Sequence, residues 1–186
     1  MSFFNNPFKQ DTYHYFGKDK VDFKHLLKDH GYRYVFYLRQ CQAGGWRKLI
    51  FSIPRKHLSL RHGIEISPEV RCGGGLYLGH PYGITVSTGA VLGMNVNLHK
   101  GCTIGRENRG KRQGYPTIGN CVSVGINATV VGRITVGDDV MIAAGSFANR
   151  DVPSHSICIG NPCQIIPKEG ATDGCIVNLS LIHISE

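Results

Sequence analysis

The sequence has no long hydrophobic run, no paired-cysteine motif and no dense run of Lys and Arg. No apolar segment approaches the roughly 18 residues that a helix needs to cross a bilayer. Residues 1–15 lack a basic start followed by an apolar core, so we do not expect them to form a signal peptide. The seven Cys residues are odd in number and form no CxxC pair, which argues against a disulfide framework and a zinc ribbon. We therefore expect a cytoplasmic protein without a membrane span or a metal.

The composition limits the class of partner. The formal charge is +8, and 24 residues are Gly. The positive balance favours an anionic partner, but no Lys/Arg run is long enough for a nucleic-acid arm, so we expect no nucleic-acid partner. Scattered Gly residues indicate many tight turns rather than a flexible linker. The densest basic patch, Arg106 to Arg112, is either a ligand site or a solvated loop.

Internal repeats are the strongest signal in the chain. An aliphatic residue stands at every sixth position in two series: Val86, Leu92, Leu98 and Ile104, then Ile118, Val124, Val130, Val136 and Ile142. A helix would repeat every ~3.6 residues and a plain strand every two. A period of six is typical of short strands joined by tight corners, with three strands to a coil and the aliphatic side chains stacked inside. Residues that tolerate positive φ would form the corners at Gly119-Asn120, Asn127 and 137–139.

Two interruptions break the repeat and are candidate functional positions. The step from Leu78 to Val86 is eight residues, so two extra residues bulge out around residues 80–83. The step from Ile104 to Ile118 is fourteen, which predicts an excursion of eight extra residues. In a rigid solenoid, insertions of this kind map to loops that often carry function.

The segment before the repeats has a different character. Apolar residues from Lys20 to Gln42 have helical spacing with a possible break at Gly31, and a second short helix is expected over 46–53, stopped by Pro54. We expect these helices to shield the open end of the solenoid. The predicted division is therefore a helical cap at 1–60, a coil at 61–166 and a tail at 167–186. In the tail, Cys175 to Ile184 is apolar enough for a strand, but the sequence does not indicate where this strand would lie relative to the coil.

Three segments carry a resemblance to a known family: Gly75–His80, residues 83–86 and Gly160–Ile166. Together with the repeats between them, they resemble the hexapeptide-repeat acyltransferases, above all serine acetyltransferases and sugar O-acetyltransferases of surface-polysaccharide gene clusters. The resemblance covers about Ile64 to Ile166. It implies a mainly β fold, a left-handed parallel β-helix of hexapeptide repeats with a short N-terminal helical cap. It also implies a homotrimer with active sites between subunits, and acetyl-CoA as co-substrate along the outside of the coils.

The resemblance also implies catalytic residues. His80 matches the general base of the serine enzymes, and Glu65 falls at the position of the acid that orients it. A neutral imidazole suits this task because its pKa lies near the working pH. The alternative interpretations are that His80 is a capped surface histidine and that Glu65 is a solvated surface glutamate.

Departures from the serine enzymes affect the acceptor. Gly79 stands where those enzymes have an Asp, and Gly114-Tyr115 stand where they have an Arg-His pair. Without these groups a zwitterionic acceptor would lack charge partners. We therefore expect transfer to a neutral hydroxyl, that of a sugar in surface-polysaccharide biosynthesis. The alternative is a serine O-acetyltransferase of cysteine biosynthesis.

Further residues are candidates for binding the two substrates. Tyr82, Tyr115 and His99 could contact the acceptor, although packing roles are equally expected for the tyrosines and a plain outward position is favoured for His99. Small residues at coil corners would let the pantetheine approach the backbone, and basic residues would meet the phosphates. The CoA candidates are Gly125, Ala143, Ala144, Gly145, Arg106, Lys111 and Lys168. Gln164 stands where the closing motif usually has a basic residue, which leaves one of the implied phosphate contacts open.

Two interpretations of another class stay open. A metal-dependent hydratase on the same fold would need three His ligands at a subunit interface, and beside His80 and His99 no convincing third is found. A non-catalytic scaffold is the other, because a fold does not dictate an activity.

Overall fold

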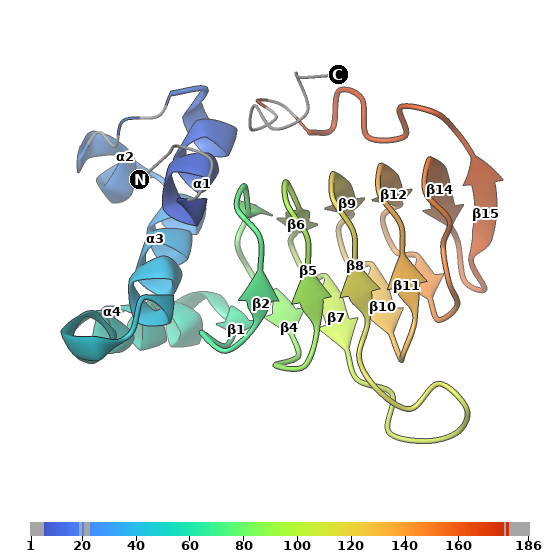
Figure 1. The fold of residues 1–186 in the computed structure, drawn as a ribbon, viewed down its shortest axis with the longest axis horizontal. Coiled ribbons are helices and arrows are strands. Elements are labelled where there is room, and N and C mark those ends of the chain that lie inside the picture. The colour runs from blue at the N-terminus through green and yellow to red at the C-terminus, as the bar shows by residue number, and fades with distance from the viewer. Residues whose placement is uncertain (1–5, 19, 21–22, 177, 179–186) are drawn as a thin grey trace.

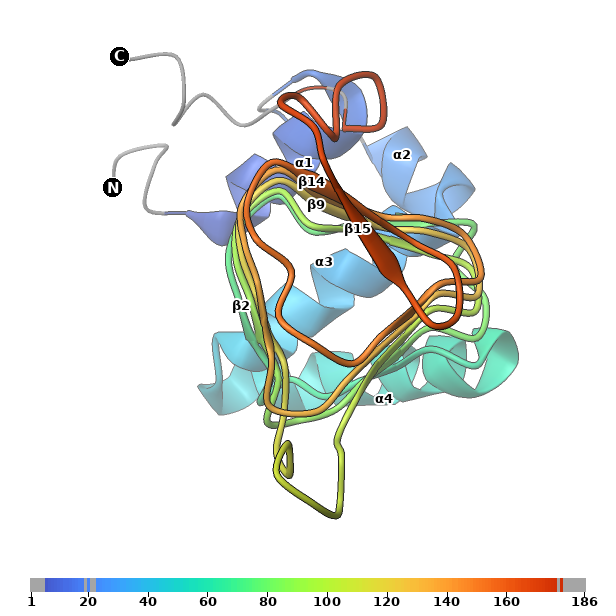
Figure 2. The ribbon, with the colours of Figure 1, turned by 90° about the vertical axis from the view of Figure 1, so that its right-hand side faces the viewer.

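A computed structural model describes residues 6–18, 20, 23–176 and 178. Four helices stand at the N-terminal end of a three-sided coil, and the C-terminal segment returns along the outside of that coil (Figure 1). Viewed along its axis, the coil is a triangular prism of stacked turns (Figure 2). The predicted left-handed parallel β-helix with a short helical cap is confirmed.

The helices occupy the first third of the chain. Their bounds are α1 Pro7–Phe16, α2 Phe23–Lys28, α3 His30–Gln42 and α4 Gly45–His62.

The strands form three sheets, one for each side of the prism, and we number the faces in chain order. Face 1 consists of β1 Glu65–Ile66, β4 Thr85–Val86, β7 Thr103–Gly105, β10 Thr129–Val131 and β13 Phe147–Ala148. Face 2 consists of β2 Arg71–Cys72, β5 Val91–Leu92, β8 Thr117–Ile118 and β11 Thr135–Val136. Face 3 consists of β3 Tyr77–Gly79, β6 Asn97–His99, β9 Val122–Val124, β12 Val140–Ile142, β14 Ser156–Ile159 and β15 Gln164–Pro167.

The six-residue repeat becomes the core of the prism, as predicted. Each aliphatic residue of the series lies opposite its counterpart three positions along the series: Val86 pairs with Ile104, Leu92 with Ile118 and Leu98 with Val124. All nine are at most 4% exposed. Burying such a continuous stack is what stabilises a solenoid, because no single coil can bury its own apolar side chains.

The corners use positive φ and close backbone approach. Asn127 and Asp139, both predicted corner residues, have φ of 54° and 50°. Gly93 instead lets the backbones of two coils approach closely, because a Cβ there would lie 2.5 Å from the carbonyl oxygen of Gly119 in the next coil. The two interruptions also fall at corners: residues 80–84 join β3 to β4, and the longer excursion projects from the corner between faces 1 and 2 (Figure 2).

The helical segment differs from the prediction in three places. The N-terminal residues form a helix that was not predicted, α1, with Asn6 as its N-cap and Pro7 in its first turn. The break predicted at Gly31 lies instead at Asp29, whose carboxylate accepts a hydrogen bond from the Tyr32 N–H and starts α3. Gly31 is needed for packing, because a Cβ there would lie 2.6 Å from the Leu78 carbonyl oxygen.

Pro54 does not stop the last helix, which was expected to end at Ile53. It lies inside α4, which continues to His62. A Pro inside a helix loses one backbone hydrogen bond and clashes with the preceding turn. Tertiary packing offsets that loss here, since α4 lies against α3 with Leu58 buried and the rings of Tyr37 and Phe51 stacked.

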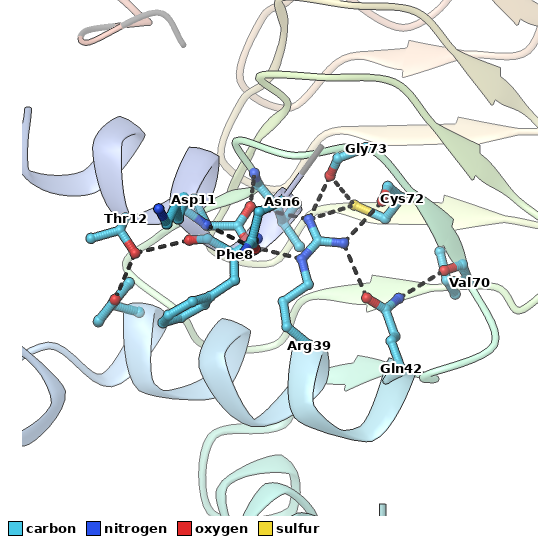
Figure 3. A network of polar contacts seen from close by, with 12 residues as sticks. Asn6, Phe8, Asp11, Thr12, Arg39, Gln42, Val70, Cys72 and Gly73 are labelled. Carbon is cyan, nitrogen blue, oxygen red and sulfur yellow. Dashed lines mark hydrogen bonds and ion pairs between the residues drawn. The ribbon is translucent and has the colours of Figure 1, made fainter. Parts of the chain in front are cut away.

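A buried ion pair joins the cap to the coil (Figure 3). Arg39 of α3 donates to both carboxylate oxygens of Asp11 in α1, at 2.8 and 3.0 Å, and to the carbonyl oxygens of Cys72 and Gly73 on the coil. Asp11 also accepts a hydrogen bond from the Leu76 N–H. Burial disfavours the charged guanidinium, but the neighbouring Asp11 carboxylate outweighs it and raises the pKa of Arg39. One guanidinium therefore links two helices and two coil carbonyls.

The tail turns back over face 3. β15 pairs antiparallel with β14, and the following residues reach the Asp139 carboxylate, which accepts hydrogen bonds from Ala171, Thr172 and His155. Of the segment expected as a strand, Cys175 and Ile176 lie in a turn, and nearly all the rest lies outside the described residues. Among the described helices, none is both long enough and apolar enough to cross a bilayer.

We predict that Arg39→Ala lowers the free energy of unfolding by about 3–5 kcal/mol, because it leaves the Asp11 carboxylate buried without its cation. Urea unfolding followed by circular dichroism measures the change. Lys48→Ala, at an exposed position on α4, is the control and should stay within about 0.5 kcal/mol of the wild type. Equal stabilities of the two variants would contradict the role assigned to this ion pair.

Candidate active site

One edge of the prism, between face 3 and face 1, collects the candidate residues. Backbone hydrogen bonds run up this edge from coil to coil: Gly83 N–H to His62, Gly101 N–H to Tyr82, Asn127 N–H to Lys100 and Gly145 N–H to Ile126. We call this column of corner residues, together with the bulge at 80–83, the His80 edge. Because each coil repeats the same turn there, side chains distant in sequence lie above one another.

His80 stands at the bulge that the eight-residue step predicts. Its φ is 49°, and its side chain is exposed directly after β3. The Tyr82 N–H donates to the His80 carbonyl oxygen at 2.7 Å, which closes a tight turn through Pro81. The backbone therefore fixes the imidazole at the outer surface of the edge, where a ligand can reach it.

Tyr82 packs at the N-terminal end of the same edge. Its ring lies 4.9 Å from that of His62, the last residue of α4, in an edge-to-face arrangement. The side chain still exposes 46% of its surface. The tyrosine thus both packs against the cap and offers a face to solvent beside His80.

His99 follows the buried Leu98 on β6 and is half-buried on the outer side of face 3. It lies beside Gly79 in the register between β3 and β6, and its ring fills the space that a side chain at 79 would need. Burial lowers the pKa of His99, and the nearby His80 lowers it further. The absence of a side chain at position 79 is therefore explained by an imidazole from the next coil.

Glu65 lies on face 1, in register with Thr85 and adjacent to the His80 edge. It lines a pocket of 450 Å³ with Arg55, Arg106 and Tyr115. Among the described residues, no hydrogen bond or ion pair connects Glu65 with His80, so the proposed orienting contact stays a prediction. Instead, the structure brings Glu65 together with two arginines.

Arg106 and Tyr115 meet across the base of the long excursion. The Arg106 guanidinium lies 5.3 Å from the centre of the Tyr115 ring, within cation–π range. The ring packs onto Gly89, where a Cβ would come within 2.5 Å of it. This pair closes one wall of the pocket that contains Glu65. Arg106, a CoA candidate, therefore lies beside Tyr115, an acceptor candidate, and away from the small-residue CoA candidates.

The small-residue candidates for CoA lie on the His80 edge. Gly125 fits close to the coil above it, since a Cβ there would lie 2.7 Å from the Ala144 nitrogen. Gly145 has φ +67° and open space around its Cα, and Ala144 is exposed. A long extended ligand could therefore lie against this edge with its chain close to the backbone.

The basic candidates do not gather at one place. Lys111 lines a pocket of 320 Å³ with Arg109 and Arg112, and the Lys168 N–H donates to the His155 carbonyl oxygen near the tail. A larger pocket, of 820 Å³, is lined by Arg112, Arg150 and Gln164, among others. Arg150 donates to the Cys163 carbonyl oxygen, so a cation is present beside Gln164 after all.

The sequence reasoning missed Arg55 and Arg150. The predicted helix ended at Ile53, before Arg55, so nothing in the sequence indicated that Arg55 contacts the coil. Its guanidinium donates to the Ile66 carbonyl oxygen at 3.2 Å. Arg150 follows β13 at the corner next to the long excursion, and the repeat register alone places it there. Among the described residues, no group of three His, Cys, Asp or Glu side chains is arranged to hold a metal ion.

We predict that the imidazole of His99 titrates below 6.5, and that His80→Gln raises this pKa without restoring the ordinary value, because burial persists when the like charge is removed. Histidine-labelled protein followed by NMR measures both pKa values, with His99→Asn for assignment. His57→Gln, at an exposed position on α4, should leave the titration unchanged. A His99 pKa that does not respond to His80→Gln would mean that the two rings do not interact.

Comparisons with known proteins agree on one group of relatives. No family model matches the chain. A serine acetyltransferase of Arabidopsis thaliana is 37% identical over 120 residues, which are 64% of this chain and 37% of that protein. One from Helicobacter pylori is also 37% identical, over 58% of this chain and 63% of its own. The chain thus spans from about a third to under two thirds of these two relatives.

Solved structures give the same picture. The crystal structure of Neisseria gonorrhoeae serine acetyltransferase in complex with serine has a TM-score of 0.70 at 29% identity, covering 86% of this chain and 67% of that one. That of the Brucella abortus serine acetyltransferase has a TM-score of 0.73 at 28% identity, covering 89% and 70%. The chain thus shares its six-residue repeats and three-sided coil with these proteins, and over more than half of its length it is similar to serine acetyltransferases.

Proposed function

We propose that this protein is an O-acetyltransferase that moves the acetyl group of acetyl-CoA to the hydroxyl of a small acceptor, and that the acceptor is L-serine. The observation that carries the proposal is the exposed His80 on an edge lined with small residues, in a coil whose relatives are named serine acetyltransferases. The serine acceptor rests on those relatives, one of which was solved in complex with serine.

His80 performs the chemistry in this proposal. Its neutral imidazole takes the proton of the acceptor hydroxyl as the oxygen attacks the thioester carbon. When the carbon–sulfur bond breaks, the imidazolium returns the proton to the departing thiolate. The acetyl group is then on the acceptor oxygen and the proton is on the CoA thiol, and this mechanism requires no metal.

The pocket on face 1 supports a zwitterionic acceptor. It contains a carboxylate, Glu65, and the guanidinium groups of Arg55 and Arg106, charges that match an ammonium and a carboxylate group. The charge partners missing at positions 79, 114 and 115 can thus be supplied from elsewhere. The absence of charged side chains at these three positions predicted a sugar acceptor, but with this pocket present it does not by itself exclude a zwitterionic one.

The His80 edge and the 820 Å³ pocket support the donor. The small residues around Gly125 and Gly145 would hold the pantetheine chain against the backbone. Arg112 and Arg150 would meet the phosphates, since both line the 820 Å³ pocket at the C-terminal end of the coil. In a homotrimer, which we propose from the resemblance alone, the edge of one subunit would face its neighbour and enclose the donor.

A neutral hydroxyl acceptor is the second candidate, and one observation favours it. The His99 ring fills the space beside Gly79, so an imidazole stands where the serine enzymes have an Asp carboxylate next to the base. An imidazole with a lowered pKa is neutral at pH 7 and can hydrogen-bond a sugar hydroxyl.

We predict acetyl transfer from acetyl-CoA to L-serine, measured as release of free CoA thiol and as O-acetylserine by mass spectrometry. Hexoses and amino sugars, offered at the same concentration, should react more slowly because they lack the charges that the face 1 pocket can pair. Faster acetylation of a sugar than of serine would favour the second candidate. Absence of transfer to either class would remove the proposed activity.

We predict that His80→Ala lowers kcat by about 10²- to 10⁴-fold, because the variant lacks the base that removes the acceptor proton. The same thiol assay measures the loss, and circular dichroism checks that the coil is intact. His57→Ala, which removes an exposed imidazole from the cap, should keep wild-type turnover. Wild-type kcat in the His80 variant would exclude this residue as the base.

A further inference from the structure

Helix α4 exposes an apolar stripe along its outer side. Five large apolar side chains are each between 56% and 79% exposed: Trp46, Leu49, Ile50, Ile53 and Leu60. Their spacing of three, four and seven residues places them on one face of the helix. The opposite face packs inward, where Leu58 and His62 are buried. In most surface helices the apolar face is the buried one, so this stripe is unusual.

The same helix carries a dense positive charge. It contains five Lys or Arg residues and no Asp or Glu: Arg47, Lys48, Arg55, Lys56 and Arg61. Residues 1–62 hold 12 of the 21 Lys and Arg residues and 4 of the 13 acidic residues, which gives +8 for this part. The remaining 124 residues hold nine of each, so their net charge is zero. The entire excess charge of the chain therefore lies in the cap.

The basic residues flank the stripe. At 100° per residue, Lys56 lies along one border of the stripe and Arg61 along the other. Arg55 points the other way, since it donates to the Tyr34 hydroxyl and the Ile66 carbonyl oxygen. At 1.5 Å per residue the 18-residue helix is about 27 Å long. It thus presents an apolar strip bordered by cations, on the outside of the molecule.

We infer that α4 docks flat on an anionic lipid bilayer. The apolar stripe would enter the boundary between headgroups and acyl chains, and Lys56 and Arg61 would meet the lipid phosphates. Charge complementarity selects this occupant. A contact between the α4 stripes of two copies would bring two basic helix surfaces together, and nucleic acid offers no apolar surface to cover the Leu and Ile side chains.

Docking of this kind would position the His80 edge. α4 ends at His62, whose ring contacts Tyr82 beside His80. The N-terminal end of the edge would then lie near the lipid surface. The inference concerns binding alone, so it stands or falls independently of the acceptor and of the proposed activity.

The test uses the full chain and its single Trp, which lies on the stripe. Vesicles of phosphatidylcholine with about one third phosphatidylglycerol should bind the protein in a flotation assay and shift the Trp46 emission to shorter wavelength. Vesicles of pure phosphatidylcholine should bind it at least about tenfold more weakly, and about 0.5 M salt should weaken binding to the anionic vesicles.

Variants separate the two parts of the surface. The double change Leu49→Ser with Ile53→Ser, at positions that are both 75% exposed, should lower the vesicle partition coefficient about tenfold or more. Lys56→Glu with Arg61→Glu should do the same. The matched controls, Ile166→Ser on β15 and Arg71→Glu on β2, are exposed changes elsewhere and should bind as the wild type does.

Three results would overturn the inference. One is absence of binding to anionic vesicles by the wild type. Another is equal loss of binding in the stripe variants and the controls. The third is a fall in molar mass of the Leu49→Ser, Ile53→Ser variant by light scattering without vesicle binding by the wild type, which would identify the stripe as an interface between copies. Binding of the wild type to duplex DNA but not to vesicles would likewise replace the lipid surface by nucleic acid.

Discussion

The aliphatic column inside the prism sets the position of every outward side chain. Val86 lies opposite Ile104 and Leu98 opposite Val124, so the stacked side chains stay in register even where an insertion lengthens a coil. A slip of one residue would turn the stacked side chains outward. Because the column cannot slip, the corner that holds His80 lies in line with the corners at Gly125 and Gly145. The candidate site is a consequence of this register.

The cap is tied to the coil by polar contacts as well as by apolar packing. The Asp11–Arg39 pair replaces hydrogen bonds that the first coil would otherwise leave to solvent at Cys72, Gly73 and Leu76. A buried charge of this kind stabilises the joint only while both partners are present. The cap therefore has one defined orientation on the coil, and this orientation fixes where α4 presents its outer face.

Sequence reasoning predicted what is local or periodic. The six-residue repeat identified the prism, its core and the bulge at His80, because the inward positions of each coil can be recognised in the sequence of that coil. The predictions were wrong where the local structure depends on contacts with residues distant in sequence. Pro54 stays inside α4 because α3 supports the helix, and Gly31 is needed because Leu78 lies against it. The contact of His99 with Gly79, and the placement of Arg55 and Glu65 in one pocket, involve residues 20 and 10 positions apart in sequence, which no local pattern could predict.

The antiparallel strand β15 has a consequence for how copies of the chain can meet. A parallel solenoid ends in unpaired backbone groups, which are a template for the next molecule. β15 pairs with β14 along its length and covers that end of face 3, while the helices cover the first coil. The outer edge of β14 is thereby closed to addition of a parallel strand from another copy, and any such addition would have to use the antiparallel strand β15 instead.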